Sequence, residues 1–238
     1  MEEMRQSTFN EVPRGRIAAL NEPHLACVLL LDTSSSMSGP PIDSLNKAIK
    51  DFKEKTSLDE LARKRVDVAI IEFNDTARVV QEFTPLPELQ PVTLSAGGCT
   101  AMGEGINLAI DKVKERNRFY ASMGTPCFKP WIFMITDGEP TDDISAARQR
   151  IREEESKSTH GKLKFWALGV PRSDGIPEYR KETLQSLTKR CIAIDEAKFS
   201  GIFDWMSDGF VLISVSHVDD NPQLPNLPEG AQVIPRDW

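Results

Sequence analysis

Short segments made entirely of apolar residues recur along this chain, and segments with helical spacing of apolar residues separate them. Residues 25–31 read LACVLLL, and residues 131–136 read WIFMIT. A run of this length without polar alternation is typical of a strand that is buried on both faces of a sheet. Strands of this kind, alternating with helices, predict a parallel sheet covered by helices on both sides.

The spacing of apolar residues also places the individual elements. In residues 41–55, Ile42, Leu45, Ile49 and Phe52 lie three or four positions apart and form one helical face. The turn signal Asn74-Asp75 predicts that the next segment returns as a hairpin partner. We expect a doubly wound, mostly parallel, Rossmann-like α/β sheet with one antiparallel edge hairpin. The expected strands are 25–31, 66–73, 77–83, 131–136, 164–170 and 191–194, and the expected helices are 41–55, 100–118, 144–156, 176–188 and 199–213.

The length of the chain suits one large α/β domain or two small ones, and we expect one domain with two flanking segments. The chain has 238 residues, of which 39% are hydrophobic and 27% charged, so it can bury a sizeable core. We expect the domain over residues 25–214, after an N-terminal lead (1–24) and before a proline-rich tail (215–238). The tail is a poor helix former and is expected to be extended, either as a loose terminus or as a docked strap.

The charge balance and the cysteines bear on location and partners. The formal net charge is −7, which disfavours a general nucleic-acid binder. No apolar run approaches the roughly 18 residues that span a bilayer, and residues 1–16 carry no apolar core of a secretory signal. The four cysteines are scattered without a C-x-x-C motif, and three dispersed histidines do not suit a zinc site. We therefore expect free thiols, a cytoplasmic setting and no membrane insertion.

The residues directly after the first buried strand have the chemistry of a metal site. Asp32, Ser34 and Ser36 alternate in the segment DTSSSM, so their oxygens can turn to one side of a loop. A carboxylate and two hydroxyls are hard oxygen donors that suit Mg²⁺, Mn²⁺ or Ca²⁺. A serine-rich loop that caps the next helix is the alternative interpretation of this segment alone.

Two further loops strengthen the metal hypothesis. Thr100 follows Gly97-Gly98 and precedes an expected helix, and Asp137 comes at the end of the strand 131–136. In open parallel sheets, ligands bind beyond the carboxyl ends of the strands, where all three loops are expected. Five oxygen ligands from three distant positions therefore predict one divalent cation site.

These five residues resemble the metal-ion-dependent adhesion site (MIDAS) of the von Willebrand factor A (VWA) domain. The resemblance rests on the D-x-S-x-S loop with Asp32, Ser34 and Ser36, on Thr100 and on Asp137, and it spans residues 25–213. TDGEPTD at residues 136–142 and the proline-rich tail are similar to the bacterial cytoplasmic TerY/YegL-like branch. That branch implies a stress-response or tellurite-resistance system. The family usually has Gly between the two serines, whereas this chain has Ser35, which is either harmless or displaces Ser36.

Such a site predicts a function in binding. Asp32 and Asp137 balance the charge of a divalent cation, Mg²⁺ first and Mn²⁺ or Ca²⁺ as alternatives, and the other ligands are neutral. A cation with few anionic ligands attracts an Asp or Glu carboxylate from a partner protein. The resemblance implies a non-enzymatic adaptor or scaffold, with a phosphatase or kinase of the same operon as a possible partner. The alternatives are a metal-dependent hydrolase such as a phosphatase, for which no nucleophile and base are evident, and a purely structural metal.

Three neighbouring residues have simpler interpretations. Asp142 and Asp143 precede a helix and are expected to cap it rather than to support the metal. Glu139 is a candidate for contact with the metal ligands. Cys99 is expected to be a small residue packed in a tight loop rather than a reactive thiol.

Overall fold

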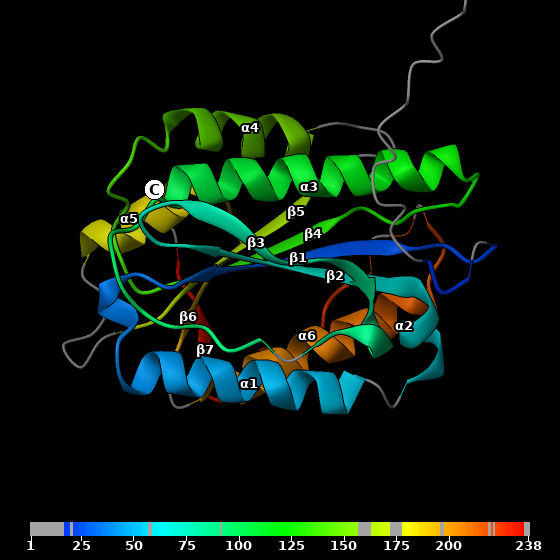
Figure 1. Ribbon diagram of the computed structural model, residues 1–238, viewed down its shortest axis with the longest axis horizontal. Coiled ribbons are helices and arrows are strands. Elements are labelled where there is room, and N and C mark those ends of the chain that lie inside the picture. Colours follow the sequence, from blue (N-terminus) through cyan, green and yellow to red (C-terminus); the bar gives the residue numbers. More distant parts are fainter. Residues whose placement is uncertain are drawn as a thin grey trace, which may run out of the picture.

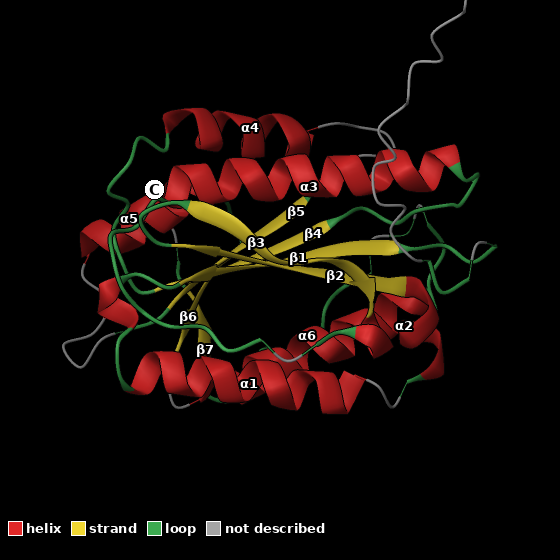
Figure 2. Ribbon diagram, in the orientation of Figure 1, coloured by secondary structure: helices red, strands yellow, loops and turns green. Residues whose placement is uncertain are grey.

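A computed structural model of the chain places a central sheet between two layers of helices (Figures 1 and 2). The structure describes residues 17–19, 21–56, 59–90, 92–156, 163–171, 178–195, 198–218, 220 and 222–235. Most of the expected N-terminal lead and the first two residues of the helix expected at 176–188 lie outside these ranges.

The sheet has seven strands in the order β3-β2-β1-β4-β5-β6-β7. β1, β2, β4, β5 and β6 run parallel, and β3 and β7 are antiparallel strands at the two edges. This arrangement confirms the predicted mostly parallel α/β sheet and the predicted hairpin. The strands are β1 (Leu25–Asp32), β2 (Val66–Phe73), β3 (Ala77–Pro85), β4 (Trp131–Thr136), β5 (Lys164–Gly169), β6 (Cys191–Ile194) and β7 (Ala231–Val233).

Helices cover both faces of the sheet (Figure 1). One face packs on α1 (Pro40–Thr56), α2 (Glu60–Arg65) and α6 (Phe199–Ser214), and the other packs on α3 (Met102–Ser122), α4 (Ser145–Ser156) and α5 (Glu178–Leu187). Two short 3₁₀ helices, η1 (Ser35–Met37) and η2 (Leu86–Glu88), lie in the connections.

β1 shows why a continuous apolar run was needed. Successive side chains of a strand point to opposite faces, so both faces of a central strand must be apolar. Leu29 and Leu31 belong to the core on the α1 and α6 side, while Val28 and Leu30 belong to the core on the α3 side. All eight residues of β1 are buried, including the terminal Asp32.

The tail forms part of the sheet where it is described. Its residues in β7 pair with β6, and Ile192 lies opposite Val233. The indole Nε1 of Trp205 donates a hydrogen bond of 2.8 Å to the carbonyl of Pro225. Of the two alternatives for this segment, the docked strap is therefore the one observed over residues 222–235, and its strand was not predicted.

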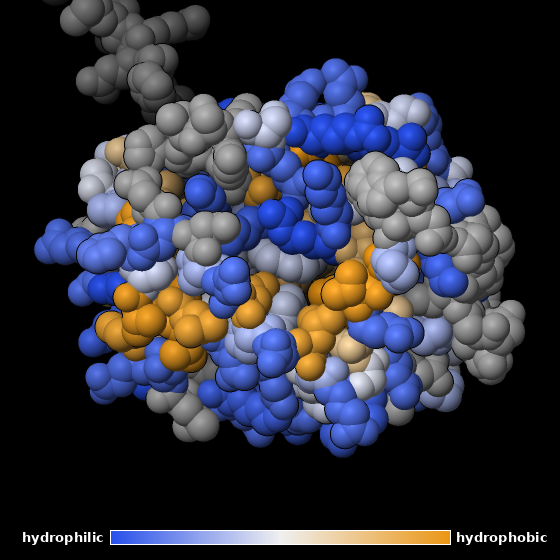
Figure 3. Space-filling model, turned by 180° about the vertical axis from the view of Figure 1, so that it is seen from behind, coloured by the Kyte–Doolittle hydropathy of each residue, from blue (hydrophilic) through white to orange (hydrophobic). Residues whose placement is uncertain are grey.

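The surface is predominantly polar with local apolar patches. On the face turned away in Figure 1, hydrophobic side chains gather in two patches with hydrophilic side chains around them (Figure 3). Within the described ranges, no helix has both the length and the apolar character needed to cross a membrane.

Candidate metal centre

Three loops meet at the carboxyl edge of the sheet. The first follows β1 and carries Ser34 and Ser36, the second leads into α3 and carries Thr100, and the third follows β4 and carries Asp137. β1 and β4 are adjacent parallel strands, so their carboxyl ends lie side by side. The topology therefore brings together residues that are about a hundred positions apart in sequence.

The oxygens of the five predicted ligands converge. The hydroxyls of Ser34 and Ser36 lie 3.0 Å apart, and Ser36 Oγ donates a hydrogen bond of 2.5 Å to Asp137 Oδ1. A methyl group placed on Gly138 would lie 3.4 Å from Thr100 Oγ1, 3.5 Å from Ser36 Oγ and 3.6 Å from Asp32 Oδ2. Side chains from all three loops thus surround one small region next to Gly138.

The electrostatics of this region favour a cation. Burial and, to a smaller extent, the nearby Asp137 carboxylate raise the pKa of Asp32 to about 6, against hydrogen bonds that lower it. These bonds come from the backbone N–H of Ser34, at 2.8 Å, and from the hydroxyl of Thr136. Two buried carboxylates with three hydroxyls offer hard oxygen donors and negative charge. The donor set therefore fits a divalent cation such as Mg²⁺.

The hydroxyls are essential to this fit. Within the described ranges, no group of three or more His, Cys, Asp or Glu side chains is arranged to hold a metal ion. The site has only two carboxylates, so any cation here depends on the serine and threonine ligands as well. This composition matches the expectation of a metal with few anionic ligands.

Ser35 connects the first two loops. Its backbone N–H and its hydroxyl both donate to the carbonyl of Gly98, at 3.1 and 2.8 Å. Gly98 has a φ of +77°, and a Cβ on it would lie within 2.7 Å of the Asp75 carboxylate, so only glycine fits there. With Ser35 in the motif, the hydroxyl of Ser36 still lies beside Asp137.

Asp142 connects the third loop to the second. Its carboxylate accepts hydrogen bonds from the backbone N–H groups of Gly103 and Glu104, at 3.0 and 2.9 Å, in the first turn of α3. The expectation that it caps the helix following it in sequence is therefore wrong, because it caps α3. Asp143 does accept from the N–H of Ser145, at 2.8 Å, where α4 begins.

α5 supports the third loop from the other side. The buried guanidinium of Arg180 donates a hydrogen bond to the main-chain carbonyl of Asp137. Glu139 accepts a hydrogen bond of 2.8 Å from the hydroxyl of Thr183. Glu139 therefore links its loop to α5, and Arg180 holds the backbone of a predicted ligand. No local pattern in the sequence indicated this role for Arg180.

Cys99 differs from the expectation. Its side chain is exposed rather than packed in the loop. A hydrogen bond to Asp75 and the negative charge of that carboxylate raise the pKa of the Cys99 thiol. The thiol is therefore mainly protonated at neutral pH, which disfavours a reactive cysteine.

The chain belongs to the von Willebrand factor type A domain family. The model of that family matches residues 27–199, which include all five converging residues. Domains of this family often serve as metal-dependent modules for protein interaction. A search of curated protein sequences finds no significant match.

Solved structures share the fold at low sequence identity. Proximal thread matrix protein 1 from the mussel byssus is 18% identical, with a TM-score of 0.56 over 78% of this chain and 46% of that one. A further structure of that protein, with zinc in its MIDAS motif, is 14% identical, with a TM-score of 0.53 over 79% of this chain and 48% of that one. The pilus adhesin SpaC from Lactobacillus rhamnosus GG is 13% identical, with a TM-score of 0.64 over 81% of this chain and 30% of that one. The chain thus spans about half or less of the length of these proteins.

Proposed function

We propose that this protein is a non-enzymatic interaction module that binds a partner protein through a divalent cation. The observation that carries the proposal is the convergence of Asp32, Ser36 and Thr100 around the position of Gly138, with Ser36 bonded to Asp137. Asp32, Ser34, Ser36, Thr100 and Asp137 are the proposed ligands. A bound cation supplies a Lewis-acidic centre that accepts an Asp or Glu carboxylate from the partner.

The residues of the chain prepare this centre for one incoming ligand. Asp32 is buried and fixed by the Ser34 N–H and the Thr136 hydroxyl, so it presents its carboxylate in one orientation. Ser36 is partly exposed, which leaves an approach from solvent. Mg²⁺ is the proposed cation, because the donors are all oxygens; zinc in the mussel protein makes Zn²⁺ a competitor to include in the measurements.

The setting is a second part of the proposal. We propose a bacterial cytoplasmic protein of the TerY/YegL-like branch, acting in a stress-response or tellurite-resistance system with a phosphatase or kinase of the same operon. TDGEPTD at residues 136–142 and the proline-rich tail support this assignment.

A hydrolase is less well supported by the arrangement of the histidines. His24 is fully buried and bonds Asp67 near the amino ends of β1 and β2, away from the metal loops. His217 lies after α6. Neither of these two histidines is therefore placed to act as a base beside the cation.

The experiment that tests the proposal compares the wild type with Asp32→Ala, and Asp43→Ala serves as a matched control because it removes an exposed carboxylate on α1. Titration calorimetry with Mg²⁺, Mn²⁺ and Zn²⁺ measures metal binding, and affinity purification with and without EDTA measures partner binding. We expect Asp32→Ala to lose both while remaining folded by circular dichroism. Partner binding that survives both EDTA and Asp32→Ala would refute the proposal, and metal-dependent turnover of p-nitrophenyl phosphate would favour the hydrolase.

A further inference from the structure

A second cavity lies where the tail crosses the sheet, away from the metal loops. It has a volume of about 400 Å³, within the range of about 300–1,000 Å³ that is usual for small-molecule sites. Lys164 opens β5, so the cavity reaches the amino end of that strand, whereas the metal loops leave the carboxyl ends of β1 and β4. The tail supplies one wall. The lining includes Lys164, Trp166, Arg190, Trp205, Gln223 and Leu224.

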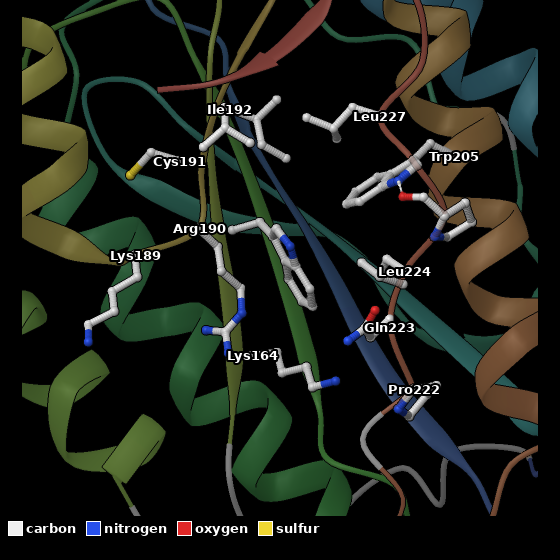
Figure 4. A pocket seen from close by; sticks show the side chains of 13 residues that line it. Lys164, Lys189, Arg190, Cys191, Ile192, Trp205, Pro222, Gln223, Leu224 and Leu227 are labelled. Carbon is white, nitrogen blue, oxygen red and sulfur yellow. Dashed lines mark hydrogen bonds between the residues drawn. The ribbon is translucent and has the colours of Figure 1, made fainter. Parts of the chain in front are cut away.

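The charge in this cavity is positive although the chain as a whole carries −7. Lys164, Lys189 and Arg190 line it together. Arg190 is partly neutralised by Glu155, whose carboxylate lies 2.6 Å from the guanidinium. Lys189 is exposed and points away from the other two in Figure 4. The cation that distinguishes the cavity is therefore Lys164.

Lys164 is a buried cation with no acid opposite it among the described residues. The residue is 8% exposed, and its Nζ lies 5.7 Å from the centroid of the Trp131 ring. Burial, together with the positive charges of Arg190 and Lys129, lowers the pKa of Lys164 to about 8. In Figure 4 the ammonium is directed toward the tail segment that carries Gln223 and Leu224. A buried ammonium without a carboxylate partner is costly, so an anion bound in the cavity would stabilise it.

The apolar part of the cavity is held in place before any ligand arrives. Trp166 stacks on Phe133 with ring centroids 4.6 Å apart, and the Arg190 guanidinium lies 5.5 Å from the centroid of the Trp166 ring. Trp205 is fixed by its hydrogen bond to the carbonyl of Pro225. Both tryptophans are only 5% exposed, so their indoles give the cavity an ordered apolar wall rather than a free aromatic face.

We propose that this cavity binds a small organic anion, a phosphate or carboxylate joined to an aromatic body, with Lys164 on the anion and the apolar lining of Trp205, Leu224 and Leu227 around the ring. The ammonium of Lys164 and the apolar walls together define the class of ligand. A buried ammonium forms a charge-assisted bond with an anion, and the apolar walls exclude a fully hydrated ion. The site is separate from the proposed metal centre and does not depend on it.

The test uses 1-naphthyl phosphate as the probe, and tryptophan fluorescence and titration calorimetry follow its binding. Neutral 1-naphthol has only the aromatic ring of the probe, and inorganic phosphate has only its anionic group. We expect the wild type to bind the probe at least about tenfold more tightly than either half, because only the probe makes the charge-assisted bond and the apolar contacts together. Equal binding of the probe and 1-naphthol, or of the probe and inorganic phosphate, would overturn the proposal.

Two variants test the role of Lys164. Lys164→Met removes the ammonium and keeps an apolar stem, and Gln223→Glu places a carboxylate on the tail wall that Lys164 faces. Each should weaken binding of the probe about tenfold or more, while Lys50→Met, at an exposed position on α1, should not. Unchanged affinity in Lys164→Met and in Gln223→Glu, with folding verified by thermal melts, would refute the assignment.

A third variant separates this site from the metal centre, since phosphate could also bind a metal ion. In Asp32→Ala with EDTA present, binding of the probe should equal that of the wild type. Loss of binding under those conditions would place the probe at the metal loops and overturn the proposal.

Discussion

Ser36 donates a hydrogen bond to Asp137 although 101 positions separate the two residues in the sequence. The bond spans two loops that leave adjacent parallel strands, so it reports directly on the convergence of those loops. It also orients both groups as proposed ligands of one cation. The first prediction concerns this pair.

Ser36→Ala should weaken Mg²⁺ binding by roughly 10- to 100-fold, the range found when supporting groups of metal sites are removed. The variant loses one proposed ligand and also releases the Asp137 carboxylate that Ser36 orients. Titration calorimetry measures the affinity. Ser35→Gly restores the usual family residue and removes only the hydrogen bond from the Ser35 hydroxyl to Gly98. It is the matched control and should stay within a few-fold of the wild type. Equal losses in both variants would contradict the assigned role of Ser36.

Asp142→Ala should destabilise the fold by about 1 kcal/mol through loss of the cap on α3, and it should also weaken metal binding. Its carboxylate holds the first turn of α3, and Thr100 lies just before that turn. Asp143→Ala is the matched control, because it removes a bond at the start of α4 only. Denaturant melts and titration calorimetry separate the two effects. A variant Asp142→Ala with unchanged metal affinity would show that the cap does not position Thr100.

Arg180→Met should weaken metal binding without removing any proposed ligand. The guanidinium of Arg180 holds the main-chain carbonyl of Asp137, so its loss frees the loop after β4. We expect a smaller loss of Mg²⁺ affinity than in Ser36→Ala, measured by the same titration. Lys181→Met changes the next residue of α5 and should leave the affinity unaltered. If Arg180→Met binds Mg²⁺ as the wild type does, the support from α5 is dispensable.

These positions show what the sequence could reveal about the site. The convergence of these side chains was predictable, because each lies at the end of a strand or before a helix that apolar spacing identifies. The residues are Asp32, Ser34, Ser36, Thr100 and Asp137, and their role as metal ligands stays a prediction. The roles of Asp142 and Arg180 were not, because each depends on a contact with a residue about 40 positions away. From sequence alone, a capping residue is assigned to the helix that follows it. In the fold, however, the N-terminus of α3 lies beside Asp142.

The same reasoning explains why α2 and β7 were not predicted. The parallel strands and the long helices have enough residues for their apolar period to be distinct, and Ile42, Leu45, Ile49 and Phe52 are all buried as predicted. α2 has six residues and β7 has three, which is too short for a period to appear. β7 is a strand because β6 offers an open edge and because Trp205 holds the tail beside it, both of which are tertiary effects.

Asp67→Asn should lower stability most at neutral pH. The buried Asp67 carboxylate accepts hydrogen bonds from Arg116, at 3.0 Å, and from Tyr120, and it contacts His24 at 3.1 Å. Burial alone would raise its pKa, but these partners outweigh burial and lower it. Breaking such a buried pair costs about 3–5 kcal/mol.

The pH dependence of this loss follows from the direction of the shift. A carboxyl with a lowered pKa in the folded state stabilises the fold above its unfolded pKa of about 3.9, and this contribution disappears as the pH falls through the folded value. The difference in unfolding free energy between the wild type and Asp67→Asn should therefore shrink below about pH 4. Urea melts from pH 7 to pH 3 measure it, with the exposed Asp43→Asn as control. A difference that grows on acidification would contradict this account.

Lys164→Met should raise stability at pH 7 while it removes the proposed anion site. Burial and the positive charges of Arg190 and Lys129 together lower the pKa of Lys164 to about 8, and Lys189 also lines the cavity. A lysine of this kind opposes folding while it is charged. The penalty is complete below about pH 8 and declines as the pH rises toward the unfolded value of about 10.4.

The expected gain of Lys164→Met at pH 7 is on the order of 1 kcal/mol, and it should fall between about pH 8 and pH 10. Thermal melts over that range measure it. Lys198→Met, which removes an exposed lysine paired with Glu229, should give no such pH-dependent gain. A less stable Lys164→Met at pH 7 would mean that the ammonium is already compensated within the protein. In that case, the charge of Lys164 would give no reason to expect an anion in the cavity.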